Sequence, residues 1–137
     1  MACYVIDAPT LLHLVDNALT VGAGHQVVAP NMIRTEALEL LLCEVRRGTR
    51  TERESLAAHD RITELKMRLL GDRVSRATAW KIARSQGWDS LRDAEYLSVT
   101  RLQADALVTI DPAMAAKAAD VVPLAPLEAL LTNDRAG

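Results

Sequence analysis

Four acidic side chains stand at apolar or boundary positions, where an unpaired carboxylate is costly. Asp7 and Asp111 each end a short apolar run, Glu36 borders the apolar stripe of an expected helix, and Asp93 lies near the start of another. Carboxylates that share a site repel one another, and a divalent cation removes this conflict. All-oxygen ligation suits Mg²⁺ or Mn²⁺, which can activate a bound water for attack on phosphorus. The four residues therefore predict a metal site for phosphodiester hydrolysis.

Two buried strands are expected to position the aspartates. Residues 3 to 6 and 106 to 110 are continuous apolar runs, typical of strands covered on both faces. Two further strands are expected at 26 to 29 and 121 to 123. Strands that alternate with helices predict a three-layer α/β/α fold with a central, mostly parallel sheet of four to five strands. Ligands bind outside the carboxyl ends of such strands, where Asp7 and Asp111 stand.

The helices are expected from apolar residues at helical spacing and from start and stop signals. Pro30 suits the first turn of a helix that Gly48 ends, and Thr51 with Glu54 forms a capping box for the next helix. Trp80 and Leu56 are expected to pack on the apolar sides of their helices. Helices are expected at 10 to 19, 30 to 47, 51 to 69, 74 to 85, 89 to 102, 112 to 118 and 126 to 131.

Each carboxylate also has a purely structural interpretation. An aspartate at a strand end often caps the following helix, and Glu36 fits a solvated helix position. Asp93 lies where the helix dipole favours a carboxylate. Asp89, four residues earlier on the same face, is the better candidate for the cap, but spacing alone does not decide which of the two belongs to the metal site. The joint arrangement on two strand ends and two helices favours a shared site.

Length and composition indicate one domain over residues 1 to 132, followed by a polar tail at 133 to 137. The chain has no Phe and half of its residues are apolar, so an aliphatic core is expected. Cys3 and Cys43 lie in apolar stretches and are expected to be buried free thiols. No apolar run approaches the length of a membrane span and no signal segment opens the sequence, so a cytoplasmic protein without membrane contact is expected.

The charge is unevenly distributed. Residues 34 to 84 hold twelve basic and eight acidic residues, although the net charge of the chain is −2. Solvated helix faces explain most such asymmetry, and a basic flank that guides a polyanion to an acidic pocket is the alternative. Two basic clusters could contact phosphates: Arg46, Arg47, Arg50 and Arg53, and Arg73, Arg76, Lys81 and Arg84.

Four stretches of the sequence together carry a resemblance to a known family. They are Tyr4-Val5-Ile6-Asp7-Ala8, Ala29-Pro30 followed by Glu36 and Leu40, Arg92-Asp93-Ala94-Glu95-Tyr96-Leu97, and Ala106-Leu107-Val108-Thr109-Ile110-Asp111. In this order and spacing, over nearly the whole chain, they resemble a PIN domain, and more narrowly the VapC-type toxins of bacterial type II toxin–antitoxin pairs.

The resemblance implies a PIN-like fold and a Mg²⁺- or Mn²⁺-dependent endoribonuclease. Its catalytic and metal-binding quartet would be Asp7, Glu36, Asp93 and Asp111, because the Asp-Ala-x-Tyr pattern of the family begins at Asp93 and not at Asp89. Thr109 matches a hydroxyl that helps to hold the site in the family. Pro9 stands where the family often has Ser or Thr, which leaves Thr10 as the candidate for that contact.

The resemblance also implies partners. Family members cleave RNA, usually form homodimers, and are inhibited by a small antitoxin that inserts a segment into the active site. The apolar helices at 30 to 47 and 51 to 69 resemble the paired helices on which antitoxins pack, and an intramolecular core explains the same residues equally well. A catalytically silent PIN-like module that binds RNA or protein is the alternative function. A phosphatase with a strand-end Asp nucleophile is disfavoured, because Pro9 replaces the second Asp of that pattern.

Overall fold

The computed structural model describes residues 2–133, and a parallel β-sheet forms the centre of this part of the chain. Its strands lie in the order β3-β2-β1-β4 and are β1 (Cys3–Ile6), β2 (Gln26–Pro30), β3 (Arg68–Leu70) and β4 (Ala106–Val108). All neighbouring pairs are parallel, so the carboxyl ends share one edge of the sheet. Ile6, Leu107 and Val108 are fully buried, as expected for strands covered on both faces.

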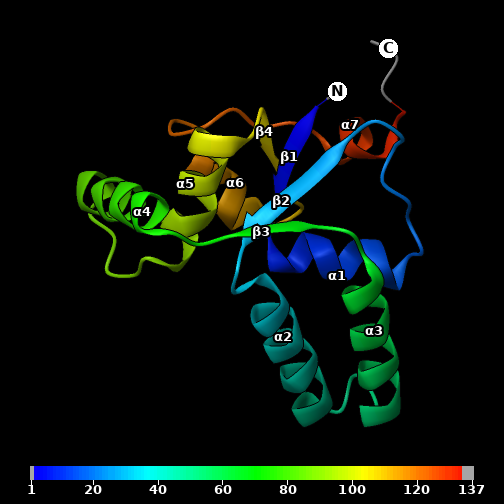
Figure 1. Cartoon of the computed structure of the whole chain (residues 1–137). Helices are drawn as coiled ribbons and strands as arrows, with labels where there is room; N and C mark the ends of the chain where they lie inside the picture. The colour runs from blue at the N-terminus through cyan, green and yellow to red at the C-terminus, as the bar shows by residue number, and fades with distance from the viewer. Residues whose placement is uncertain (1, 134–137) are drawn as a thin grey trace.

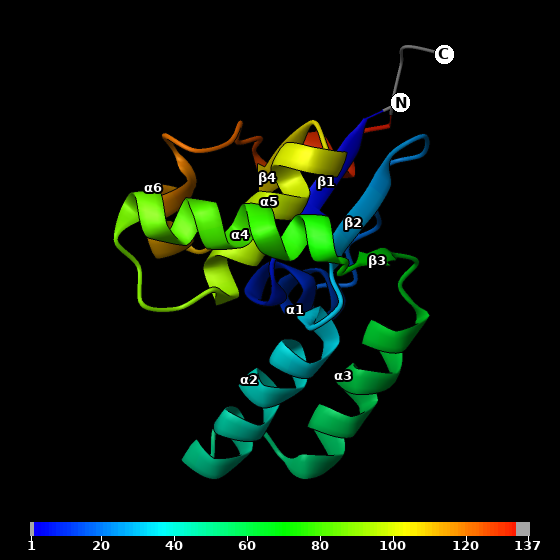
Figure 2. The same cartoon turned by 60° about the vertical axis from the view of Figure 1, so that its left-hand side comes forward.

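Seven helices flank the sheet within the described residues. They are α1 (Ala8–Asp16), α2 (Ile33–Arg47), α3 (Glu52–Glu64), α4 (Arg73–Gln86), α5 (Arg92–Gln103), α6 (Pro112–Ala118) and α7 (Leu127–Leu131). The chain returns from β3 across the sheet to β4 through α4 and α5. α5 packs against β1, β2 and β4, with α4 outside it (Figure 2). The expected three-layer α/β/α fold is confirmed.

The order of the strands creates a crevice at one edge of the sheet. The chain runs from β1 outward to β2 and β3, and then returns to place β4 on the other side of β1. At such a reversal the connections after the two strands that border it, here β1 and β4, leave in opposite directions, and the gap between them is the usual ligand site of open α/β sheets. Asp7 and Asp111 follow the two strands that border this gap.

α2 and α3 form a helical hairpin that projects from the sheet (Figure 1). Gly48 ends α2 with a φ of 78°, a conformation that disfavours residues with a side chain. Thr51 and Glu54 form the expected capping box at the start of α3. The expectation that Leu56 packs on the apolar side of its helix is wrong, because α3 belongs to this projecting hairpin. The side chain of Leu56 is 57% exposed.

Several element boundaries differ from the expectation. Pro30 ends β2, where it is the register partner of Leu70, and α2 begins only at Ile33. The helix expected at 51 to 69 stops at Glu64, and residues 68 to 70 form the edge strand β3. Only an isolated bridge, between Leu107 and Leu124, forms near the strand expected at 121 to 123.

Other expectations about side chains are also wrong. Cys43 is exposed and Cys3 is only half-buried, although both are free. Trp80 is 60% exposed because only the opposite side of α4 packs against the body. Asp89 does not cap α5; the backbone N–H of Arg92 instead donates to Ser90 Oγ at 3.2 Å. The core is aliphatic, as expected.

Among residues 2–133, no helix combines the length and the apolar character needed to cross a bilayer. The expected polar tail, residues 133 to 137, lies outside the described residues except for its first member.

Candidate functional site

Asp7 is the most firmly held of the predicted site residues. It is the N-cap of α1 and is 3% exposed. Its Oδ1 accepts hydrogen bonds from the backbone N–H of Thr10, at 3.3 Å, and from the Thr10 hydroxyl. Its Oδ2 accepts from the Thr109 hydroxyl at 2.7 Å. Burial raises the pKa of Asp7, and these hydrogen bonds lower it, so the donors offset part of the cost of burying the charge.

The two threonines connect this carboxylate to the end of β4. Thr10 Oγ1 accepts a hydrogen bond from the backbone N–H of Ile110, and Thr109 Oγ1 accepts one from that of Asp111, both at 3.1 Å. Each hydroxyl donates its single proton to Asp7, so both carboxylate oxygens have a fixed orientation. Thr10 thus supplies the hydroxyl contact that Pro9 cannot make.

Glu36 lies in the first turn of α2 with an unsatisfied oxygen. Its Oε1 is buried without a hydrogen-bond partner, and the Arg92 Nε lies 4.0 Å from it. Burial raises the pKa of Glu36 to about 7, and the positive charge of Arg92 opposes this shift. A buried carboxylate oxygen without a partner is a costly arrangement that a bound cation would relieve.

Tyr96 brings a second unsatisfied group into the same region. Its side chain is buried, and its hydroxyl has no hydrogen-bond partner among the described residues. Burial raises the pKa of Tyr96 above its usual range, and the negative charges of Glu36, Asp7 and Asp93 raise it further. Although the Tyr96 hydroxyl and Glu36 Oε1 do not meet hydrogen-bond geometry, the hydroxyl is near enough to lower the pKa of Glu36.

The other two aspartates have structural partners. Asp93, in the first turn of α5, accepts a hydrogen bond from Lys117 of α6, with 2.7 Å between Nζ and Oδ2. Lys117 also lies 5.2 Å from the centre of the Trp88 ring. Asp111 caps α6, because its Oδ1 accepts from the backbone N–H of Ala113 at 3.0 Å. The capping interpretation of a strand-end aspartate therefore holds for Asp111, as it does for Asp7.

One pocket of about 240 Å³ collects all four predicted acids. It lies at the carboxyl edge of the sheet, between the starts of α1, α5 and α6 and one side of α2. Arg92, Pro9 and Met114 also line it, and Asp89 does not. The structure thus brings Asp7, Glu36, Asp93 and Asp111 to one site.

The donor set fits Mg²⁺ or Mn²⁺ by chemistry, since it offers only carboxylate oxygens, one of them buried without a partner. The four acids are not arranged in this conformation as the ligands of one ion. Within residues 2–133, no three acidic, histidine or cysteine side chains are arranged to hold a single ion. The ion pair between Asp93 and Lys117 accounts for one of the four acids.

Sequence reasoning missed three residues of the pocket region. The sequence pattern indicates no role for Lys117, and none for Arg92 or Tyr96, although the last two lie in a stretch that resembles a PIN domain. Tyr96 lies three residues after Asp93 on α5, so helical spacing could have placed both on one side. Lys117 reaches Asp93 only because α6 packs beside the start of α5, and no local pattern carries that information.

No family model matches the chain, and a search of curated proteins finds no match. Among solved structures, the chain is similar to the crystal structure of PAE2754 from Pyrobaculum aerophilum, with a TM-score of 0.73. The two share 22% sequence identity over 95% of this chain and 93% of that protein. This similarity supports the fold over almost the full length.

Proposed function

We propose that this protein is a Mg²⁺- or Mn²⁺-dependent endoribonuclease of the PIN type, which hydrolyses RNA phosphodiester bonds at Asp7, Glu36, Asp93 and Asp111. The observation that carries the proposal is the meeting of these four acids in one pocket at the strand reversal. The sequence resemblance to PIN domains, which had selected the same four residues, supports it independently of the geometry.

The residues of the pocket have distinct roles in this proposal. Asp7 is a preorganised ligand, because Thr10 and Thr109 hold both of its oxygens. Burial raises the pKa of Glu36 to about 7, and Glu36 would have to be deprotonated to help hold a cation, since ligation requires the carboxylate. A bound divalent cation would lower the pKa of a coordinated water and stabilise charge at the phosphate.

Two cationic side chains complete the site. Arg92 is 61% exposed at the pocket and is free to contact a phosphate while it remains near Glu36. Lys117 pairs with Asp93, so a cation held by Asp93 would compete with this ion pair. Lys117 would then be available to the anionic substrate.

As part of the same proposal, the protein is the toxin of a type II toxin–antitoxin pair and forms a homodimer. An apolar groove of about 340 Å³ between α2 and α3 supports the presence of a small antitoxin. Leu42 and Leu56 on its walls are 59% and 57% exposed, as expected for a groove that an apolar helix of a partner covers.

The test is cleavage of a panel of structured and unstructured RNAs by the purified protein. We expect cleavage with Mg²⁺ or Mn²⁺, none with EDTA, and recovery when the metal is restored in excess. Cleavage that persists in EDTA would contradict a metal-dependent centre, and contamination is excluded by the same assay on a Glu36→Gln protein from an identical preparation.

One observation favours a second candidate, a catalytically silent module that binds RNA or protein. Lys117 already neutralises Asp93, and no group of three possible ligands is assembled among residues 2–133. In this case the protein would bind RNA equally well with and without divalent cations. It would also show no thermal stabilisation by Mn²⁺.

A further inference from the structure

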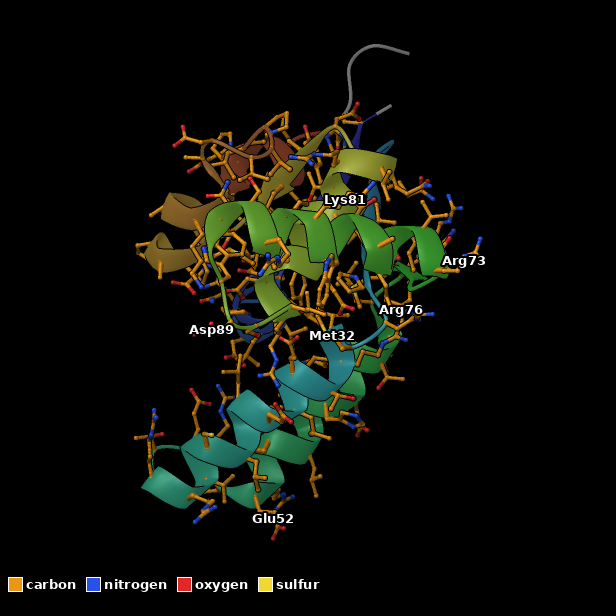
Figure 3. The ribbon with its side chains drawn as sticks, turned by 90° about the vertical axis from the view of Figure 1, so that its left-hand side faces the viewer. Met32, Glu52, Arg73, Arg76, Lys81 and Asp89 are labelled. Atoms are coloured by element: carbon orange, nitrogen blue, oxygen red, sulfur yellow. The ribbon has the colours of Figure 1, made fainter. Side chains whose placement is uncertain are left out.

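Helix α4 carries a concentration of positive charge. Its 14 residues include Arg73, Arg76, Lys81 and Arg84 and no Asp or Glu. All four side chains are exposed. The helix packs on α5 through its other side, which includes the buried residues Ala79, Ile82 and Ala83. Figure 3 shows α4 in front of the body, with Arg73, Arg76 and Lys81 along its length.

An exposed tryptophan lies in the middle of this charged surface. Trp80 is seven residues after Arg73 and four before Arg84, so helical geometry places the three on one side of α4. Its side chain is 60% exposed, in a protein in which only 3% of residues are aromatic. The other tryptophan, Trp88, packs partly against the core and lies beside Lys117. Packing within the chain therefore does not explain Trp80.

The charges of this surface are not neutralised within the described part of the chain. None of the four basic side chains of α4 lies within ion-pair distance of a carboxylate of residues 2–133. The Arg76 guanidinium donates one hydrogen bond, to the carbonyl oxygen of Gly71 at 3.1 Å. The nearest carboxylate along the chain is that of Asp72, which is exposed and caps the start of α4. A helix with four exposed cations and no acidic residue of its own attracts a polyanion, and an exposed indole offers a flat apolar partner.

We propose that the exposed side of α4, formed by Arg73, Arg76, Trp80, Lys81 and Arg84 and called the α4 platform here, binds single-stranded RNA. The cations contact phosphates, and an unpaired base stacks on Trp80. The strand is single because the faces of paired bases are already covered by their neighbours. That this RNA is the substrate of the acidic pocket rests on the proposed function, whereas the binding itself does not.

A short segment connects the platform to an element of the acidic pocket. Residues 87 to 91 join the end of α4 to the start of α5, where Arg92 and Asp93 line the pocket. A helix of this length extends about 21 Å, so a strand held along it is bound at several nucleotides. The stacked base and the cleaved bond would then be separate positions of one RNA.

The test uses a fluorescein-labelled single-stranded RNA 12-mer of mixed sequence and anisotropy in EDTA, where cleavage does not occur. We expect Trp80→Ala to weaken binding by about 5- to 100-fold, as stacking of one base predicts. Arg73→Ala with Arg84→Ala should reduce the slope of log affinity against log salt by about 1.4. The matched control is Arg61→Ala with Lys66→Ala, the same loss of charge at two exposed positions outside both basic clusters, and it should change affinity by less than about threefold.

A second probe identifies the kind of polyanion. A blunt RNA duplex of equal length should bind more weakly and lose little affinity on Trp80→Ala. Two results would refute the proposal that the α4 platform binds single-stranded RNA. One is that Trp80→Ala binds the 12-mer like the wild type, and the other is that the control double variant weakens binding more than Arg73→Ala with Arg84→Ala. Displacement of the RNA by polyglutamate at equal charge concentration would also refute it and indicate an acidic protein partner.

Failure of the platform and failure of the proposed function give different results. Loss of RNA binding in Trp80→Ala together with full cleavage by Asp7→Asn would support the platform and contradict the nuclease site. The reverse pattern, unchanged binding in Trp80→Ala and no cleavage by Asp7→Asn, would refute the platform alone. Far-ultraviolet circular dichroism and a urea titration of each variant exclude a loss of fold, which is not expected for an exposed side chain.

Discussion

Substitution of Glu36 by Gln should stabilise the protein and remove its activity together. The pKa of Glu36 is raised from 4.5 to about 7 in the folded chain, first of all by burial. The folded state therefore binds more protons than the unfolded state between these pH values, and stability falls as pH rises from about 4.5 to 7. A glutamine at this position has no charge to bury, so the variant lacks this decline.

The magnitude follows from the shift in pKa. The full difference corresponds to roughly 3 kcal/mol, because each tenfold change in proton affinity is worth about 1.4 kcal/mol. The side chain of Glu36 is 16% exposed and Arg92 lies 4.0 Å away, so solvent and this charge screen part of the cost. We expect metal-free Glu36→Gln to exceed the wild type by about 1–2 kcal/mol at pH 8 and by nearly nothing at pH 4.

Urea unfolding in EDTA at pH 4, 6 and 8 measures this difference. Glu64→Gln, the same change at an exposed position at the end of α3 and outside the pocket, should stay within about 0.5 kcal/mol of the wild type at each pH. In Mn²⁺ the order should reverse, since only the wild type gains stability from the ion. If Glu36→Gln is less stable than the wild type at pH 8 in EDTA, the assignment of Glu36 as a strained, buried acid is wrong.

Three further outcomes are expected. Thr109→Val should destabilise the protein by about 1–2 kcal/mol in a urea titration, because it removes a donor to buried Asp7 and an acceptor for a backbone N–H, whereas Thr109→Ser should not. Lys117→Gln should cost under about 1 kcal/mol but lower the Kd for Mn²⁺ in calorimetry, and an unchanged Kd would refute competition at Asp93. Tyr96→Phe should raise metal-free stability by about 1 kcal/mol in the same titration at pH 4, where Glu36 is protonated, because it removes a buried hydroxyl without a hydrogen-bond partner; a loss of stability at this pH would show that the hydroxyl is bonded.

The parts of the fold that sequence predicts are those encoded by local pattern. The runs before Asp7 and Asp111 are apolar at consecutive positions and stop at a carboxylate, which defines both the strand and its carboxyl end. β3 has no such pattern, because Leu65 and Leu69 continue the helical spacing of α3 and only pairing with β2 makes residues 68 to 70 a strand. Pro30 is equally compatible with a strand end and a helix start, and tertiary pairing decides between them.

In the candidate site, too, sequence predicts some residues and not others. Asp7 and Asp111 could be named from sequence because each ends an apolar run, and Glu36 because it borders an apolar stripe. Spacing did not separate Asp93 from Asp89, and only the resemblance to a PIN domain favoured Asp93. The partners of these acids could not be named, since Lys117 depends on the packing of α6 beside α5 and the orphaned oxygen of Glu36 depends on what surrounds α2. The exposure of Trp80 likewise depends on which side of α4 meets α5, a choice that composition does not make.

The most direct test compares two aspartate variants in one cleavage assay. Asp7→Asn removes a carboxylate charge inside the pocket, and Asp89→Asn makes the same change at an exposed residue outside it. With Mg²⁺ and an RNA that the wild type cleaves under single-turnover conditions, we expect Asp7→Asn to lose at least about 100-fold in rate and Asp89→Asn to keep the wild-type rate. Equal rates for Asp7→Asn and the wild type would contradict a metal-dependent nuclease centre at this pocket.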